Sequence, residues 1–221
     1  MQRRQFLASG SALMLAGLAG CTGGLRYSLT EVIERLLTLS SQRAFARLMA
    51  PGGFYDSQIA RISLPDRLSG KGSVAMALIG AALRDRLLQQ VNRAAEKGAE
   101  RAAPVVADAI LAISPEAAAQ IVQGKGAIAT ALLQQQMGSS LIPVMLPGVD
   151  EGLRLFDSAV VTQALRLATG IDFAGLRDDV TRKAADAIFA EIGKEEIAIR
   201  ADPRSTNDPV LIAGLSAANA M

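Results

Sequence analysis

The chain has 221 residues, half of them apolar, with no histidine and a single cysteine. Histidine-based triads, histidine metal sites, disulfides and thiolate zinc sites are therefore excluded, and no metal or cofactor is predicted. Without residues 1–20, which hold Arg3 and Arg4 and no acid, 21 basic residues face 21 acidic ones, so a nucleic-acid partner is not expected.

The N-terminus has the pattern of a secretory signal that ends at a lipidation site. Arg3 and Arg4 form a positive segment, residues 6–18 are moderately apolar, and Leu-Ala-Gly precedes Cys21. The apolar run is shorter than the roughly 20 residues of a membrane span. The ending resembles a bacterial lipobox, which implies cleavage before Cys21 and acylation of that cysteine. We expect residues 1–20 to be a signal peptide and residues 22–28 to tether the domain to a membrane.

Two details bear on export and sorting. The sequence Arg-Arg-Gln-Phe-Leu at residues 3–7 resembles a twin-arginine export motif, and a general secretory signal with two incidental arginines is the alternative. Thr22 follows the cysteine in place of the Asp that favours retention in the inner membrane. The predicted location is the periplasmic side of the envelope, with outer-membrane delivery inferred from Thr22.

Helical periodicity dominates the rest of the chain. The predicted helices cover residues 29–49, 74–101, 104–113, 115–123, a hairpin over 126–149, 148–156, 158–169 and 173–201. Residues 54–65 form a connector after the first helix, and Pro104 is assigned to the first turn of a new helix. The predicted fold class is all-α: a single bundle of about seven or eight helices over residues 29–203. The tail, residues 204–221, is expected to form a short helix at most.

Residues 126–149 contain no charged side chain. Glutamines, glycines and two prolines within them argue against a membrane span. The favoured interpretation is a helical hairpin buried at the centre of the bundle. The alternative is an apolar surface that lines a cavity for a lipid-like ligand or contacts a partner, with the candidate residues Leu132, Met137, Ile142 and Met145.

The best candidate for a polar site is a set of five residues. Asn92, Arg93 and Glu96 share one face of the predicted second helix, Asp108 follows in the next predicted helix, and Asp186 lies on the last long helix. One interpretation is a small anion or carboxylate site between helices. The favoured interpretation is structural: Asn92 and Glu96 fix their helix against the connector, and Arg93 pairs with acids.

Two stretches carry a family resemblance. Residues 92–110 begin with Asn-Arg-Ala-Ala-Glu and continue with Ala-Pro and Asp-Ala-Ile, and residues 183–203 hold Lys-Ala, Asp-Ala-Ile-Phe, Glu-Glu and Ile-Arg before a proline. With supporting matches at 53–54 and 62–65, they resemble the motifs of the bacterial family called domain of unknown function 4197, over about residues 29–206. The resemblance implies an all-helical exported domain and no particular reaction. The chain departs from the family pattern in its uncharged tail and in its charge-free middle segment.

These observations predict a lipid-anchored, non-catalytic binding or structural module, whose partners are the membrane and an envelope protein or lipid-like ligand. A carrier of an apolar ligand near residues 126–149 is the first alternative, and it predicts a cavity lined by the candidate residues of that segment. A glycan hydrolase with two carboxylates is the second alternative, although the chain has no Trp to line a sugar cleft. An enzyme would place Glu96 or Asp186 beside a second carboxylate in a cleft.

Overall fold

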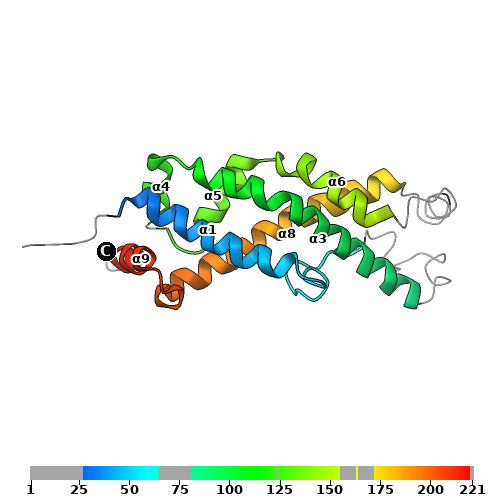
Figure 1. Cartoon of the computed structure of the whole chain (residues 1–221), viewed down its shortest axis with the longest axis horizontal. Coiled ribbons are helices and arrows are strands. Elements are labelled where there is room, and N and C mark those ends of the chain that lie inside the picture. The colour runs from blue at the N-terminus through cyan, green and yellow to red at the C-terminus, as the bar shows by residue number, and fades with distance from the viewer. Residues whose placement is uncertain (1–26, 65–80, 123, 155–162, 164–171, 220–221) are drawn as a thin grey trace, which may run out of the picture.

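The computed structural model describes residues 27–64, 81–122, 124–154, 163 and 172–219. Within them all regular structure is helical, which confirms the all-α fold class (Figure 1). The elements are α1 (Leu29–Leu48), α3 (Ala81–Leu111), α4 (Pro115–Val122), α5 (Ile128–Met137), α6 (Leu141–Leu153), α8 (Phe173–Ala201), the short 3-10 helix η2 (Pro203–Thr206) and α9 (Pro209–Asn219). Arg3, Arg4, Cys21 and the predicted helix 158–169, apart from residue 163, lie outside the described residues.

Helix starts follow the side chains that the sequence places before them. The hydroxyl of Ser28 accepts a hydrogen bond from the Glu31 N–H (3.0 Å), and Asp172 accepts one from Gly175 (2.8 Å). α1 and α8 begin at these caps, as predicted. Both helices bury an apolar stripe and pack against each other and against α3, so these three long helices form the centre of the bundle (Figure 1).

The predicted break at Pro104 is wrong, because α3 continues through this residue to Leu111. Proline cannot donate to the Glu100 carbonyl, which normally weakens a helix. Here Ala102 and Val106 on either side of the proline are fully buried, and this packing holds the helix in one piece. α6 likewise runs through Pro147, so the predicted start of a new helix at residue 148 is also wrong.

The charge-free segment forms two helices, α5 and α6, but they do not pair as the predicted hairpin. α6 packs mainly along α3, and α5 packs mainly along α8. Gly148 and Gly152 explain the closeness of α6 to α3, since a Cβ at either position would overlap the α3 backbone at Lys97 or Ala94. Each helix buries only one side, with Leu133 and Met137 of α5 and Met145 and Val149 of α6 in the core, whereas residues 134–136 and 138–140 are exposed. The expected burial of the whole segment at the centre of the bundle is therefore wrong.

The tail forms an 11-residue helix that docks on α1 (Figure 1). One oxygen of Asp208 accepts hydrogen bonds from Val210 and Leu211, and the other pairs with Arg35 of α1 at 3.0 Å. Val210, Leu211 and Leu215 are buried. The end of the chain thereby covers part of the first helix.

Candidate functional site

Three buried polar side chains from two helices hold residues 50–64 in place. This stretch adds the turn at residues 50–53 to the described part of the connector predicted over residues 54–65, and the name connector is used for all of it below. The first is Asn92 of α3, which is fully buried. Its Oδ1 accepts from the Ile62 N–H (2.8 Å), and its Nδ2 donates to the carbonyls of Ile62 (3.0 Å) and Leu88 (2.7 Å). One amide side chain therefore satisfies both backbone groups of Ile62, much as a neighbouring strand would.

The second anchor is Glu96, one turn further along α3. Its Oε1 accepts a hydrogen bond from the Gly52 N–H at 3.0 Å, and the side chain is only 8% exposed. Burial raises the pKa of the Glu96 carboxyl above its ordinary value, and the amides of Gly52 and Phe54 and the charge of Arg93 offset only part of this effect. The carboxyl group is committed to the backbone of the connector and does not point into solvent.

The third anchor is Glu191 of α8, which is 2% exposed. Ser57 donates to its Oε1 at 2.7 Å, while the same hydroxyl accepts from the amides of Ile59 and Ala60. Burial alone would raise the pKa of Glu191, but the Ser57 hydrogen bond and the charges of Lys194 and Arg47 outweigh it and lower the pKa. Glu191 is therefore a carboxylate held between the connector and α8.

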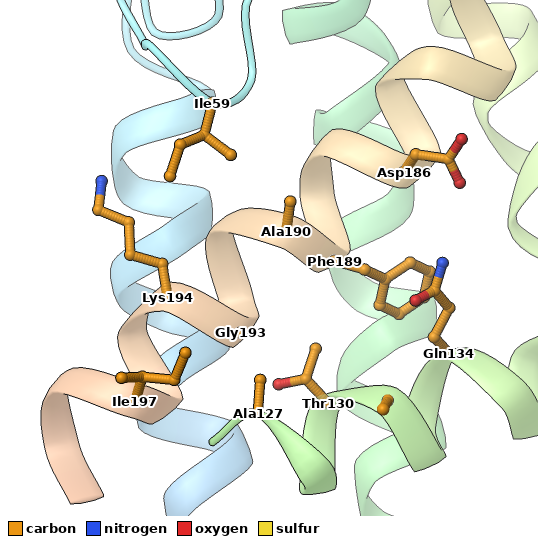
Figure 2. Close-up of a pocket in the computed structure, with 11 residues that line it drawn as sticks. Ile59, Ala127, Thr130, Gln134, Asp186, Phe189, Ala190, Gly193, Lys194 and Ile197 are labelled. Atoms are coloured by element: carbon orange, nitrogen blue, oxygen red, sulfur yellow. The ribbon is translucent and has the colours of Figure 1, made fainter. Parts of the chain in front are cut away.

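These anchors place Ile59 at the edge of a groove along α8, which we call the α8 groove. Its apolar part is a hollow of about 530 Å³ between α8 and the start of α5, where Ala127, Ala131 and Gln134 form the opposite wall. Figure 2 shows Ile59 and Lys194 on one side of α8, with Thr130 and Gln134 on the other. Ile59 is 49% exposed and Ile197 is 50% exposed, so large apolar side chains border the groove in contact with water.

A charged part adjoins this hollow and shares Ile59 and Lys194 with it. It has a volume of about 590 Å³ and is also lined by Arg47, Glu191 and the turn at residues 50–53. Arg47 lies 2.6 Å from Glu195 and 3.4 Å from Glu191, and Lys194 lies 3.3 Å from Glu191. The side chains of Arg47 and Lys194 are 48% and 52% exposed, whereas the two carboxylates are almost fully buried. The exposed side chain of Asp56 also lines this hollow, so this end of the groove presents charges of both signs.

The structure does not bring the five predicted polar residues together. Asn92 bonds to Ile62 of the predicted connector and Glu96 bonds to Gly52 just before it, which agrees with this part of the structural interpretation. Arg93 and Asp108 are exposed on α3. Asp186 is exposed on α8, where it lines the groove. No single anion or carboxylate site contains all five.

The predicted apolar residues lie mostly in the core. Met145 is fully buried and Met137 is 8% exposed, while Leu132 and Ile142 are partly buried. A Cβ at Gly98 of α3 would lie 3.2 Å from the end of the Met145 side chain, so the glycine leaves room for Met145 where α6 crosses α3. The linings of the two hollows described above contain none of the four.

The pair of Glu196 and Arg200 on α8 has the i to i+4 spacing of an ordinary surface ion pair, but it is buried. Glu196, with no exposed surface, accepts hydrogen bonds from the amides of Ala129 (3.0 Å) and Thr130 (2.7 Å) and from the Thr130 hydroxyl (2.7 Å). Arg200 pairs with Glu196 at 2.8 Å. The carboxylate thus caps α5, whose own N-cap Ala127 has no side-chain hydrogen bond.

The sequence contained a usable signal for these acids. Glu191, Glu195 and Glu196 occur among the apolar positions of the α8 stripe, beside Ile188, Ile192 and Ile199. A carboxylate in a buried stripe requires cations or N–H donors from elsewhere. What the sequence does not reveal is which distant segments supply them.

No described helix combines the length and apolar character that a membrane span requires. The described residues also contain no group of three or more potential metal ligands close enough to hold an ion.

Comparison with known proteins identifies a family. A family model described as "Protein of unknown function (DUF4197)" matches residues 26–213. No curated protein and no solved structure matches the chain. The matched range contains both anchoring residues of α3 and the whole of the α8 groove.

Proposed function

The chain belongs to the DUF4197 family, and on this premise we propose that it is a lipid-anchored, non-catalytic binding module of the bacterial cell envelope. The anchor is the acylated Cys21, and the binding surface is the α8 groove. The domain faces the periplasm, and residues 22–28 keep it within a short distance of the membrane.

The observation that supports a binding role is the way in which the connector is held. Asn92, Glu96 and Glu191 are buried polar side chains, each of which costs free energy unless it is hydrogen-bonded. All three bond to the connector, and together they keep Ile59 half exposed beside Ile197. Apolar side chains that border a hollow in a fixed geometry are a common property of protein-binding surfaces.

The geometry favours this role over catalysis. Glu96 accepts a hydrogen bond from the connector backbone, and Asp186 is an exposed side chain on a different helix. A glycan hydrolase needs two carboxylates facing each other across a sugar-binding cleft. The carboxylates that line the charged end of the groove are Asp56, which is exposed, and Glu191, which is already bonded to Ser57 and paired with Lys194.

The carrier alternative receives less support than the binding module. Met137 and Met145, which would line its pocket, fill the core and leave little room for a ligand. The hollows that the described residues do form are open grooves at the surface.

The anchor is tested by labelling cells with an alkyne analogue of palmitate. We expect the chain to be labelled and to sediment with membranes, and we expect Cys21→Ser to lose the label and to be released from them. Equal membrane sedimentation of the Cys21→Ser variant, without label, would contradict lipid anchoring.

The binding surface is tested in the same cells with a photo-crosslinking amino acid at Ile197. A matched control position is Leu111, which is 70% exposed at the end of α3 and does not line the groove. We expect adducts with protein from position 197 and not from position 111. Equal adduct formation at both positions, or none at either, would contradict a specific binding role of the groove.

A further inference from the structure

The last part of the connector, residues 61–64, is an extended segment. Exposed and buried side chains alternate along it, and Ile62 and Leu64 are the buried ones. The N–H and C=O groups of Ile62 both bond to Asn92, so they point to the same side of the chain, as the two groups of one residue do in a β-strand. Asn92 of α3 thus takes the place of a neighbouring strand along one edge of this segment.

The opposite edge of the extended segment is open. In extended backbone the N–H and C=O groups of Arg61 and Ser63 point away from the side that Ile62 uses, and therefore away from α3. Lys183 of α8 agrees with this direction, because its ammonium group donates to the Ser63 carbonyl at 3.2 Å. No described residue bonds to the N–H or C=O of Arg61 or to the N–H of Ser63. Buried backbone groups are almost always paired, so these unpaired groups of two exposed residues face water.

A hollow of about 290 Å³ lies beside the open edge. The extended segment forms one wall, and α8 forms the other with the small side chains of Ala187 and Ala190. Arg61 and Ser63 line this hollow and neither part of the α8 groove, so the site is separate from that groove, although Ile59 borders both. The small residues of α8 leave room for a side chain that arrives next to the edge.

We propose that the open edge of residues 61–63 binds an extended peptide segment of another protein as an added strand. The peptide backbone exchanges hydrogen bonds with Arg61 and Ser63, which are two residues and about 7 Å apart, the distance at which an extended chain repeats its own edge groups. One side chain of the peptide lies over Ala187 and Ala190.

The chemistry of the edge selects this occupant over others. Unpaired N–H and C=O groups in extended backbone are a template for another strand. A helix bonds its own backbone groups internally, and an acyl chain has no such groups, so either would leave the edge of Arg61 and Ser63 unpaired.

The test uses the mature chain isolated from a bacterial host, held in nanodiscs if its cysteine is acylated. In the free chain we expect the amides of Arg61 and Ser63 to exchange hydrogen at least tenfold faster than the amide of Ile62, which donates to Asn92. A displayed library of random nine-residue peptides is then selected on the chain. We expect the best binder to slow exchange at Arg61 and Ser63 at least tenfold and to leave exchange at Ile62 within twofold.

Backbone methylation of the selected peptide identifies how it binds. Each N-methyl group removes one peptide N–H, and an added strand bonds to its neighbour through every second residue. We expect methylation to weaken binding at least tenfold at alternate positions and by less than threefold at the positions between them.

Variants at residue 63 locate the binding. Ser63→Pro removes the N–H, and proline is tolerated at strand edges, so we expect the affinity to fall at least tenfold. Ser63→Ala is the matched control, since it removes only the hydroxyl and keeps the N–H, and its affinity should stay within twofold. Urea unfolding of both variants separates a loss of binding from a loss of folding, and if Ser63→Pro does not fold, the methylation pattern decides.

Several outcomes would overturn the proposal: protected amides of Arg61 and Ser63 in the free chain, no selected peptide, a peptide that slows neither amide, or methylation effects without alternation. Protection in the free chain would mean that the edge is already occupied. Crosslinking at Ile197 reports on the α8 groove instead, so the proposed function and this inference can fail independently.

Discussion

The exchange Asn92→Ala examines how strongly the connector depends on a single amide. Asn92 has no exposed surface and makes three hydrogen bonds, two of them to the backbone of Ile62. Each such bond contributes about 1 kcal/mol net to stability, and a buried partner left unsatisfied costs about 1–3 kcal/mol. Allowing for water entry at Ile62, we expect a loss of about 3 kcal/mol, measured by urea unfolding with an unchanged slope.

Hydrogen exchange gives a local readout of the same change. The Ile62 amide donates to Asn92, so its protection should fall at least tenfold more than that of amides within α8. Arg93→Ala is the matched control, because Arg93 is the exposed neighbour, and a change within about 0.5 kcal/mol is expected for it. A loss below about 1 kcal/mol for Asn92→Ala, with Ile62 still protected, would refute the anchoring role of the amide.

Three further changes test other parts of the structure. Gly152→Ala should destabilise the domain by about 1–3 kcal/mol in urea unfolding, since a Cβ there overlaps the α3 backbone, and an unchanged midpoint would mean that α6 moves away freely. Arg200→Met should lower the free energy of unfolding by about 3–5 kcal/mol, because it leaves the buried carboxylate of Glu196 without its cation. The double variant Arg200→Met with Glu196→Gln should lose less stability than Arg200→Met alone, and an equal loss in the two variants would argue against the ion pair. Burial raises the pKa of the Asp208 carboxyl, but Arg35 and the amides of Val210 and Leu211 outweigh this effect and lower the pKa below its ordinary value of 3.8. The stability that this group contributes is therefore present above pH 3.8 and is lost as the pH falls through the lower pKa of the folded state. Asp208→Asn should flatten the pH dependence of thermal unfolding below pH 4, and an unaltered profile would contradict the assignment.

Local signals account for the parts of the fold that were predicted correctly. Ser28 and Asp172 are capping residues before apolar stripes, and the structure starts helices at both. Pro104 gave the wrong boundary, because the penalty for proline within a helix was outweighed by the burial of the residues on either side. Propensity describes one residue at a time, whereas the packing that overrides it comes from other elements.

The candidate site was harder to predict for the same reason. The spacing of Asn92 and Glu96 indicated one helix face and suggested the connector over residues 54–65 as their partner. Asn92 bonds to Ile62 within that stretch, and Glu96 bonds to Gly52 just before it. The groove itself was missed, because it joins Ile59 to residues of α5 and α8 that are between 68 and 138 positions away in the sequence. Only the tertiary arrangement reveals that these separate segments form one surface.

The burial of acids on α8 has a consequence for synthesis of the chain on the ribosome. Glu191 accepts a hydrogen bond from Ser57, and Glu196 accepts hydrogen bonds from the first amides of α5. Both donors are translated more than 60 residues before the acids. A nascent chain that has emerged only as far as α6 lacks these acids and also lacks the helix against which α1 packs. Ser57 and the first amides of α5 do not meet their carboxylate partners until α8 leaves the ribosomal tunnel, so this part of the domain waits for the final quarter of the sequence before it can close.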